Sequence, residues 1–335
     1  MIERPVRGSC SRRRILPSIR ESKMDRVPSP LWRNAMKQTI VVCGATGNIG
    51  SRVTGILLAA GAPVRVVGRE RVRLGPLASK GAEPWPGHLG DTAFLEKAFS
   101  GVGGAFVLIP PGYEAPDYPG YQDQVGASIV SALSKARVPR IVALSSVGAH
   151  LDKGTGPILG LHRLESRLHE LRDADVVRLR PGYFMENHLW SIPLIRSLGI
   201  NGGAVRPDVP IPMVATEDIA RAAARLFLAG KFTGSKVRYL LGPGDLTLDE
   251  ATRILGEAIG KPGLKYVQFP EEDARKALAG AGMSESAVES MLEMERGFNQ
   301  GMIRPTRERD AESTTPTTLG DFAKSVFAGA YQAAA

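Results

Sequence analysis

Cysteine is scarce in this sequence, which has only Cys10 and Cys43 among its 335 residues. Cys10 lies in a polar stretch near the N-terminus, whereas Cys43 lies in an apolar run. Two isolated cysteines provide neither a framework of disulfides nor the ligand spacing of a metal site. We therefore expect no metal site, and a location in the reducing cytoplasm.

Long apolar runs are also absent. No stretch approaches the roughly 18 consecutive apolar residues that a membrane-spanning helix requires, so we expect no membrane association. With 43% hydrophobic and 23% charged residues, the composition is that of an ordinary soluble globular chain. Its length suits one large domain, or one domain with an appended lobe. The sequence contains no internal repeat.

Net charge is almost absent outside the N-terminal region. The chain carries +9, but residues 1–37 hold ten Arg or Lys against three acidic residues and so account for +7 of it. The nearly neutral body of the chain indicates no nucleic-acid partner. The N-terminal region also lacks a periodic apolar pattern, so we expect residues 1–36 to form a disordered basic extension.

Three interpretations of this extension remain open: a basic anchoring arm, a targeting segment, or residues upstream of the true start. Residues 11–16 resemble a twin-arginine export signal, but no apolar stretch of roughly 7 to 15 residues follows them. The Arg- and Ser-rich composition is typical of transit peptides, but Glu3, Glu21 and Asp25 argue against one. Met36 stands immediately before the first predicted strand, which favours a misassigned or dispensable start.

The first predicted strand leads into a turn with three regularly spaced glycines. Residues 37–51 read KQTIVVCGATGNIGS, in which the apolar run 39–43 is followed by Gly44, Gly47 and Gly50 and then by a helical pattern. A strand, glycine turn and helix start in this order leave free backbone N–H groups where a pyrophosphate can approach. The spacing G-x-x-G-x-x-G differs from the usual G-x-G-x-x-G, but the flanking strand and helix supply the context that the motif needs. The alternative is a plain turn.

Short apolar runs alternate with helical patterns from this turn to about residue 187. The alternation predicts an α/β fold of the Rossmann type, a doubly wound parallel sheet with helices on both faces. One helix is expected over residues 125–136. Beyond Asn187 the alternation loosens, although a helix is expected over residues 216–229 with Thr216 as its N-cap. The predicted strands cover residues 39–43, 63–68, 82–85, 104–109, 140–146, 175–180 and 237–241.

The carboxyl ends of the strands in such a sheet line the ligand crevice. Arg69 directly follows the second predicted strand, where an Arg accommodates the 2′-phosphate of NADP, so it favours NADP(H). Glu70 could instead bind the free 2′-hydroxyl of NAD(H), and Arg69 could be a solvated surface charge. Pro110, Ser145 and Ser146 end two further strands and are either site residues or plain loop residues.

These pieces together resemble the NmrA-like branch of the atypical short-chain dehydrogenase/reductases. The resemblance runs from about residue 37 to the C-terminus. The segment R-P-G-Y-F-M-E-N at residues 180–187 makes the likeness more specific to this branch than the glycine turn alone does. The other residues that carry it are 44–50, Arg69, 108–111, 142–146, His162 with Glu165, and 216–220.

The resemblance implies a Rossmann domain that binds NAD(P)H, within residues 37–335, and a small C-terminal α/β lobe that closes over the substrate. The lobe should come mainly from about residues 184–210 and 237–335. Members of the branch include NAD(P)H-dependent quinone and azo-dye reductases, reductases of secondary metabolism, and redox-sensing regulators without turnover. The implied cofactor-binding residues are Gly44, Thr46, Gly47, Asn48, Ile49, Gly50, Arg69, Asp91, Ile109, Pro110, Ser145, Pro181 and Tyr183.

Catalytic short-chain dehydrogenases have a Tyr and, four residues later, a Lys, and this pair is missing here. The Tyr protonates the carbonyl of the substrate, and the Lys lowers the pKa of the Tyr and holds the nicotinamide ribose. The aligned residues 160–165 read GLHRLE, so general acid catalysis on an alcohol or ketone is poorly supported. His162 falls near the Lys position and could hold the ribose, donate a proton or be structural. Tyr183 is expected where nicotinamide and substrate meet. Members of the branch often have an Asp at the position of His88, where it touches the adenine side of the cofactor. Asp91 could supply that contact instead, and it is also expected to cap a helix.

Because the Tyr and Lys pair is missing, we expect a reduction in which the protein need not donate a proton to the substrate. Hydride delivery to a quinone or similar electron-poor acceptor produces an anion that solvent can protonate, while the protein supplies position and electrostatics. We therefore expect an NAD(P)H-dependent oxidoreductase for a small molecule, with Tyr183 and Phe184 shaping the acceptor pocket. The alternatives are a non-catalytic NADP(H)-sensing regulator and a nucleotide-sugar epimerase. The sequence leaves the substrate open, and an oligomer is possible.

Overall fold

The computed structural model describes residues 38–230 and 232–334. The predicted basic extension, residues 1–36 with Cys10, lies outside the described residues. Within the described part of the chain, no helix combines the length and the apolar character needed to cross a membrane.

The largest element is a seven-stranded sheet in which every neighbouring pair is parallel. Its strand order, β10-β6-β5-β4-β1-β2-β3, runs outward in both directions from the β1–β4 pair. This order confirms the predicted doubly wound sheet of the Rossmann type. The strands are β1 (Ile40–Cys43), β2 (Val64–Gly68), β3 (Glu83–Pro86), β4 (Gly104–Val107), β5 (Arg140–Leu144), β6 (Asp175–Pro181) and β10 (Ser235–Leu240).

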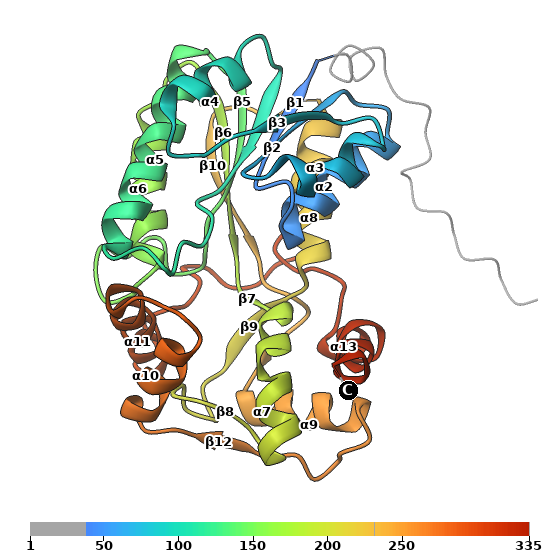
Figure 1. Cartoon of the computed structure of the whole chain (residues 1–335), viewed down its shortest axis with the longest axis vertical. Coiled ribbons are helices and arrows are strands. Elements are labelled where there is room, and N and C mark those ends of the chain that lie inside the picture. The colour runs from blue at the N-terminus through green and yellow to red at the C-terminus, as the bar shows by residue number, and fades with distance from the viewer. Residues whose placement is uncertain (1–37, 231, 335) are drawn as a thin grey trace, which may run out of the picture.

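Helices cover both faces of this sheet, as Figure 1 shows. Successive side chains of β1 point to opposite faces of the sheet. Ile40 and Val42 pack into one hydrophobic cluster, and Val41 and Cys43 pack into the other. This alternation follows from the two-residue period of a strand, and burial on both faces requires a continuous apolar run. One cluster includes α2 (Asn48–Ala59), α3 (Arg71–Ala78) and α8 (Thr216–Leu228); the other includes α4 (Thr92–Phe99), α5 (Tyr118–Lys135) and α6 (Ile158–His169).

Two helices of the Rossmann half differ from the expectation. Helix α5 begins at Tyr118, well before the predicted start at residue 125, because the side chain of Asp117 accepts a hydrogen bond from Gly120 N at 3.0 Å and caps the helix. Helix α3 was not predicted at all. It contains Gly75 and Pro76, two residues that weaken a helical pattern in the sequence.

The remaining elements form a lobe with a hydrophobic core of its own, which includes Met185, Met213, Leu255 and Phe327. In Figure 1 this lobe lies below the seven-stranded sheet. It contains the short sheets β11-β9-β7 and β12-β8, whose strands of two to four residues had not been predicted. Its boundaries within the chain stay a prediction. The elements are β7 (Tyr183–Phe184), η1 (Met185–Ser191), α7 (Ile192–Leu198), β8 (Asn201–Gly203), β9 (Ile211–Val214), β11 (Asp245–Leu246), α9 (Leu248–Ala258), β12 (Tyr266–Gln268), α10 (Glu271–Gly280), α11 (Glu285–Asn299), α12 (Leu319–Phe322), η2 (Ala323–Phe327) and α13 (Ala328–Ala333).

The predicted role of Thr216 as the N-cap of α8 is wrong. The helix begins at Thr216 itself, and Ala215 occupies the cap position. The carboxylate of Glu186 accepts hydrogen bonds from Thr216 N at 3.1 and 3.0 Å and from Thr216 Oγ1. A distant acidic side chain therefore satisfies the helix N-terminus in place of a local cap. This contact ties the segment 180–187 to the helix that packs against α2.

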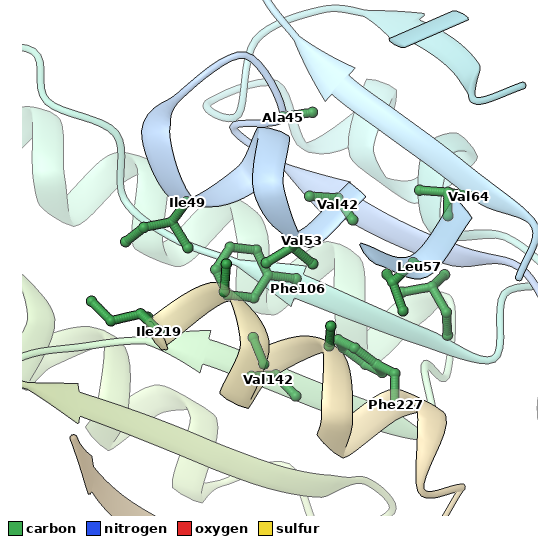
Figure 2. Close-up of a cluster of buried hydrophobic side chains, with 14 of the residues drawn as sticks. Val42, Ala45, Ile49, Val53, Leu57, Val64, Phe106, Val142, Ile219 and Phe227 are labelled. Atoms are coloured by element: carbon green, nitrogen blue, oxygen red, sulfur yellow. The ribbon is translucent and has the colours of Figure 1, made fainter. Parts of the chain in front are cut away.

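Phe106 provides a test of the core between the sheet and the helix pair α2 and α8. Its side chain is fully buried within the cluster that Figure 2 shows. We expect Phe106→Ala to lower the free energy of unfolding by about 3–5 kcal/mol, because it removes apolar contacts and leaves a cavity. Urea unfolding measures this loss. The control is Val72→Ala on α3, where the side chain is 86% exposed and the change should stay within about 0.5 kcal/mol. Equal effects of the two variants would contradict the assigned core.

Candidate functional site

The glycine turn brings the N-terminus of α2 to the end of β1. Gly44 has a φ of +61°, a left-handed conformation that favours glycine. Gly47 N donates to Gly44 O at 3.0 Å and closes the turn, and helix α2 then starts at Asn48. No side chain of the described residues caps this helix. Its first N–H groups are therefore available to an anion such as a pyrophosphate.

Gly50 is the point of closest approach between the helix and the turn. A Cβ atom at this position would lie 2.3 Å from the carbonyl oxygen of Gly44, far inside contact distance. The third glycine therefore lets α2 pack directly on the turn. Ile49 has a side chain that is only 5% exposed within the core. Of the predicted contacts, Ile49 can thus offer only its backbone N–H, whereas Asn48 is exposed and Thr46 half-buried.

The strand order reverses between β1 and β4, and in open α/β sheets ligands bind beyond the carboxyl ends of the strands at such a point. The residues that follow β4 line this place. Leu108 would contact a Cβ at Gly44 at 3.1 Å, and the carbonyl of Pro110 accepts a hydrogen bond from the Tyr121 hydroxyl at 3.3 Å. Ile109 is half-buried and packs against the cluster under α5. The structure thus brings Gly44, Ile109 and Pro110 to one edge of the sheet, as expected.

Arg69 is exposed and directly follows β2 at the same edge. Burial raises the pKa of the Tyr121 phenol, and the positive charge of Arg69 opposes this rise, so the guanidinium lies on the Tyr121 and Pro110 side of the sheet edge. Glu70, the other candidate for the ribose, lies 3.9 Å from Arg73 in an exposed ion pair. In the described chain, no carboxylate forms an ion pair with Arg69. This geometry suits a phosphate contact at Arg69.

Asp91 caps a helix in the structure. Its Oδ1 accepts a hydrogen bond from Phe94 N at 3.0 Å at the start of α4, which confirms the predicted capping role. The residue is exposed, as is His88 before it. Its contact to the adenine side of a cofactor stays a prediction.

A buried polar network lies at the carboxyl ends of β5 and β6. Ser145 Oγ donates to Glu165 Oε1 at 2.5 Å, and Arg180 donates to both oxygens of the same carboxylate at 2.9 and 2.6 Å. Arg180 Nη1 also donates to the Tyr239 hydroxyl at 3.2 Å. Burial lowers the pKa of Arg180, but the hydrogen bonds and charge of Glu165 outweigh this and raise it. Because the Ser145 proton is committed to Glu165, Ser145 can offer a bound group only its lone pairs.

His162 and its neighbour His150 lie beside this network. His162 Nδ1 lies 3.0 Å from the carbonyl oxygen of Ala149, which can only accept, so Nδ1 carries the proton and Nε2 is an acceptor in the neutral ring. Burial lowers the pKa of His150, and the charge of Arg180 lowers it further. His150 was not among the predicted site residues. In this tautomer, Nε2 of His162 can accept a hydrogen bond from a donor such as a ribose hydroxyl.

Tyr183 lies just beyond the end of β6, in the short strand β7. Burial raises the pKa of its phenol to about 12, the charge of Glu295 adds to the rise, and a hydrogen bond with Asn187 opposes it. The phenol therefore keeps its proton at neutral pH. Pro181 is buried, and its carbonyl accepts from Val147 N at 2.9 Å, which is a structural contact. Its contact with a cofactor stays a prediction.

Metal ligands were not expected from the sequence. Across the residues that the structure describes, no three His, Cys, Asp or Glu side chains gather closely enough to hold a metal ion.

With this geometry established, comparison with known proteins assigns the family. The family model described as "NmrA-like family" matches residues 36–323. The chain belongs to this family. An NAD(P)H azoreductase of Xenophilus azovorans is 28% identical over 259 residues, which cover 76% of this chain and 85% of that enzyme.

Two solved structures share the fold of this NmrA-like protein. An NADPH-dependent quinone oxidoreductase of Escherichia coli, complexed with NADPH, superposes with a TM-score of 0.73 and 24% identity, covering 86% of this chain and 99% of that one. A triphenylmethane reductase of Citrobacter sp., complexed with NADP(H), superposes with a TM-score of 0.70 and 21% identity, covering 85% and 99% of the two chains.

Sequence reasoning missed the part of the NmrA-like site that depends on tertiary contacts. Glu165 and Arg180 were noted only as parts of a motif, although a charged residue within a buried strand is a signal that it needs a charged partner. His150 and Glu295 carry no local signal, because their surroundings come from segments that are distant in the sequence.

Gly50 provides a test of the turn. We expect Gly50→Ala to weaken binding of NADPH more than tenfold and to lower the free energy of unfolding by about 1–3 kcal/mol, because the new methyl group displaces α2 or the turn. Calorimetric titration with NADPH and urea unfolding measure the two effects. Gly55→Ala, in the same helix, is the matched control, since a Cβ there meets nothing within 4 Å. Undiminished affinity in Gly50→Ala would refute the role of this contact.

Proposed function

We propose that this protein is an NAD(P)H-dependent oxidoreductase that delivers hydride to a quinone-like or other electron-poor small molecule. The observation that carries the proposal is the uncapped N-terminus of α2 on the glycine turn, located at the point where the strand order reverses. Backbone N–H groups at this position suit the pyrophosphate of a dinucleotide. The names of the azoreductase and quinone oxidoreductase relatives support the same reaction class.

NADP(H) is the cofactor that the site fits best. The glycine turn would hold the pyrophosphate, Arg69 the 2′-phosphate, and the residues around Pro110 and Ser145 the riboses and nicotinamide. The bound nicotinamide would supply hydride. The protein's own contribution is position: the turn orients the phosphates, and the bonded pair of Glu165 and Arg180 fixes Ser145.

The side chains at the ends of β5 and β6, where the nicotinamide would lie, favour an electron-poor acceptor. Both oxygens of Glu165 accept hydrogen bonds from Arg180, and one of them also accepts from Ser145, so this side chain is committed to the buried network. His162 directs its Nδ1 proton to the Ala149 carbonyl. Neither residue replaces the Tyr and Lys of carbonyl-reducing relatives. A quinone-like acceptor accepts hydride without prior protonation, and this suits a site without a strong acid beside the nicotinamide.

The proposal predicts that purified protein oxidises NADPH in the presence of quinones. We expect the nicotinamide absorbance at about 340 nm to fall faster than in controls without protein or without acceptor, for at least one member of a panel of benzoquinones and naphthoquinones. Clear NADPH binding without oxidation by any acceptor would defeat the enzyme proposal and favour a nucleotide-sensing regulator.

Arg69→Ala tests the assignment of the cofactor. A hydrogen bond to a charged group contributes about 1.5–3 kcal/mol, so we expect the variant to bind NADPH about 10- to 150-fold more weakly. Binding of NADH, which lacks the 2′-phosphate, should change little. Fluorescence titration of both nucleotides measures the difference. Arg253→Ala is the control, because Arg253 is also exposed but pairs with Glu257 on a lobe helix. Equal losses for NADPH and NADH would rule out a phosphate contact at Arg69.

A further inference from the structure

The lobe contains a cavity of about 200 Å³ whose lining residues all come from the lobe itself. They belong to the segment directly after β8, to β12 and the two residues that follow it, and to α10 and α11. The residues proposed to hold a nucleotide are not among them. The lining residues are Ala204, Gln268, Phe269, Pro270, Glu271, Leu292, Glu295, Arg296 and Asn299.

The size and the apolar part of the wall suit a small organic molecule. Phe269, Pro270 and Leu292 provide hydrocarbon surface on which such a molecule can pack. A cavity of roughly 150 Å³ with apolar walls binds benzene in another protein. The cavity in the lobe therefore has room for one ring that carries a short polar arm.

The charged side chains of the wall are two carboxylates and one guanidinium. Arg296 Nη1 donates to Glu271 Oε1 at 2.6 Å, so these two charges balance each other. Glu295 is half-buried, and its Oε2 atom is inaccessible to solvent and has no hydrogen-bond partner among the described residues. A buried carboxylate oxygen is costly unless a donor satisfies it. The ionised wall thus carries one negative charge in excess, located on Glu295.

The other side-chain donors of the wall are directed elsewhere. The amide groups of Gln268 and Asn299 both donate to the Ala204 carbonyl, at 3.3 and 3.0 Å. In the described chain, no three His, Cys, Asp or Glu side chains gather closely enough to hold a metal ion, so this wall does not suit one. An organic cation with N–H donors matches both the excess negative charge and the apolar surface.

Ionisable groups from several elements act on Glu295 or are affected by it. Burial raises the pKa of Glu295 to about 7, Glu271 of α10 raises it as well, and Arg296 of α11 lowers it. Burial raises the pKa of Tyr183 on β7 and of Tyr266 on β12, and the charge of Glu295 adds to both rises. Near neutral pH the carboxyl group of Glu295 is therefore present in both forms, and a neighbouring cation favours the ionised form.

We propose that this cavity is a binding site for a small organic ammonium ion, whose N–H groups donate to the Glu295 carboxylate while its hydrocarbon part packs against Phe269 and Leu292. The site adds a second ligand to the proposed function and does not depend on that function. Since the ammonium ion binds the ionised carboxylate, binding displaces the proton from those molecules in which Glu295 is protonated, and the buffer takes up this proton.

Calorimetric titration of the full chain with benzylamine tests the proposal, with benzyl alcohol as an uncharged ligand of nearly the same shape. We expect the wild type to bind benzylamine about tenfold more tightly, because the ammonium group forms a charge-assisted hydrogen bond with the carboxylate. Equal affinities for the two ligands, or no binding of benzylamine, would overturn the proposal. This comparison needs no variant, so it decides even where a substitution in the wall prevents folding.

Glu295→Gln keeps the shape of the side chain and removes its charge. We expect this variant to bind benzylamine about 10- to 150-fold more weakly than the wild type, the range of a hydrogen bond to a charged group. Its affinity for benzyl alcohol should change little. The matched control is Glu289→Gln, because Glu289 is exposed on the same helix and pairs with Arg275 of α10. Equal affinity of Glu295→Gln and the wild type for benzylamine would refute Glu295 as the partner.

Release of a proton gives a readout that a purely structural role of Glu295 does not produce. At about pH 7 roughly half of the Glu295 side chains are protonated, so binding of benzylamine should release about half a proton, and none in Glu295→Gln. Titration in two buffers with different ionisation enthalpies measures this number. Wild-type affinity should also fall about tenfold from about pH 8 to about pH 6. An affinity independent of pH would contradict the assignment.

The failure of this inference and that of the proposed function are distinguishable, because none of these titrations involves NADPH or turnover. A protein that oxidises NADPH with a quinone but does not bind benzylamine keeps the proposed function and loses the ammonium site alone. A protein that binds benzylamine with release of a proton keeps the site, whatever its activity towards quinones.

Discussion

The approach of helix α2 to the glycine turn is the constraint on which the cofactor end of this molecule depends. Gly50 packs on the carbonyl of Gly44 so closely that a single methyl group would not fit. This contact sets the helix axis on the end of β1, at the reversal of the strand order. Under the proposed function, the anion site is built from backbone N–H groups, whose direction is fixed by the helix and costs no side-chain entropy. The parallel strands bring the other proposed contacts, Arg69, Pro110 and Ser145, to the same edge of the sheet.

A second constraint is the buried pair of Glu165 and Arg180, whose side chains are 5% and 10% exposed. Removing two charges from water is expensive, and such a pair is weak evidence for added stability. What the pair provides is a fixed geometry at the ends of β5 and β6, because its bonds also hold Ser145 and Tyr239. The carboxylate of Glu165 is consumed in this role. Under the proposed function, this half of the molecule positions the cofactor for hydride transfer, while Glu165 is committed to Arg180 and Ser145.

The sequence predicted those features that depend on neighbouring residues. The apolar runs and the glycine turn are local patterns, and the structure confirms the sheet that they imply. Helix α3 escaped prediction because Gly75 and Pro76 break its pattern, although packing of Leu74 and Leu77 in the core still forms it. The N-terminus of α8 was assigned to Thr216 because the partner, Glu186, lies 30 positions away. Glu295 could not be found at all, since the residues that line the same cavity, such as Gln268 of β12 and Glu271 of α10, belong to other elements.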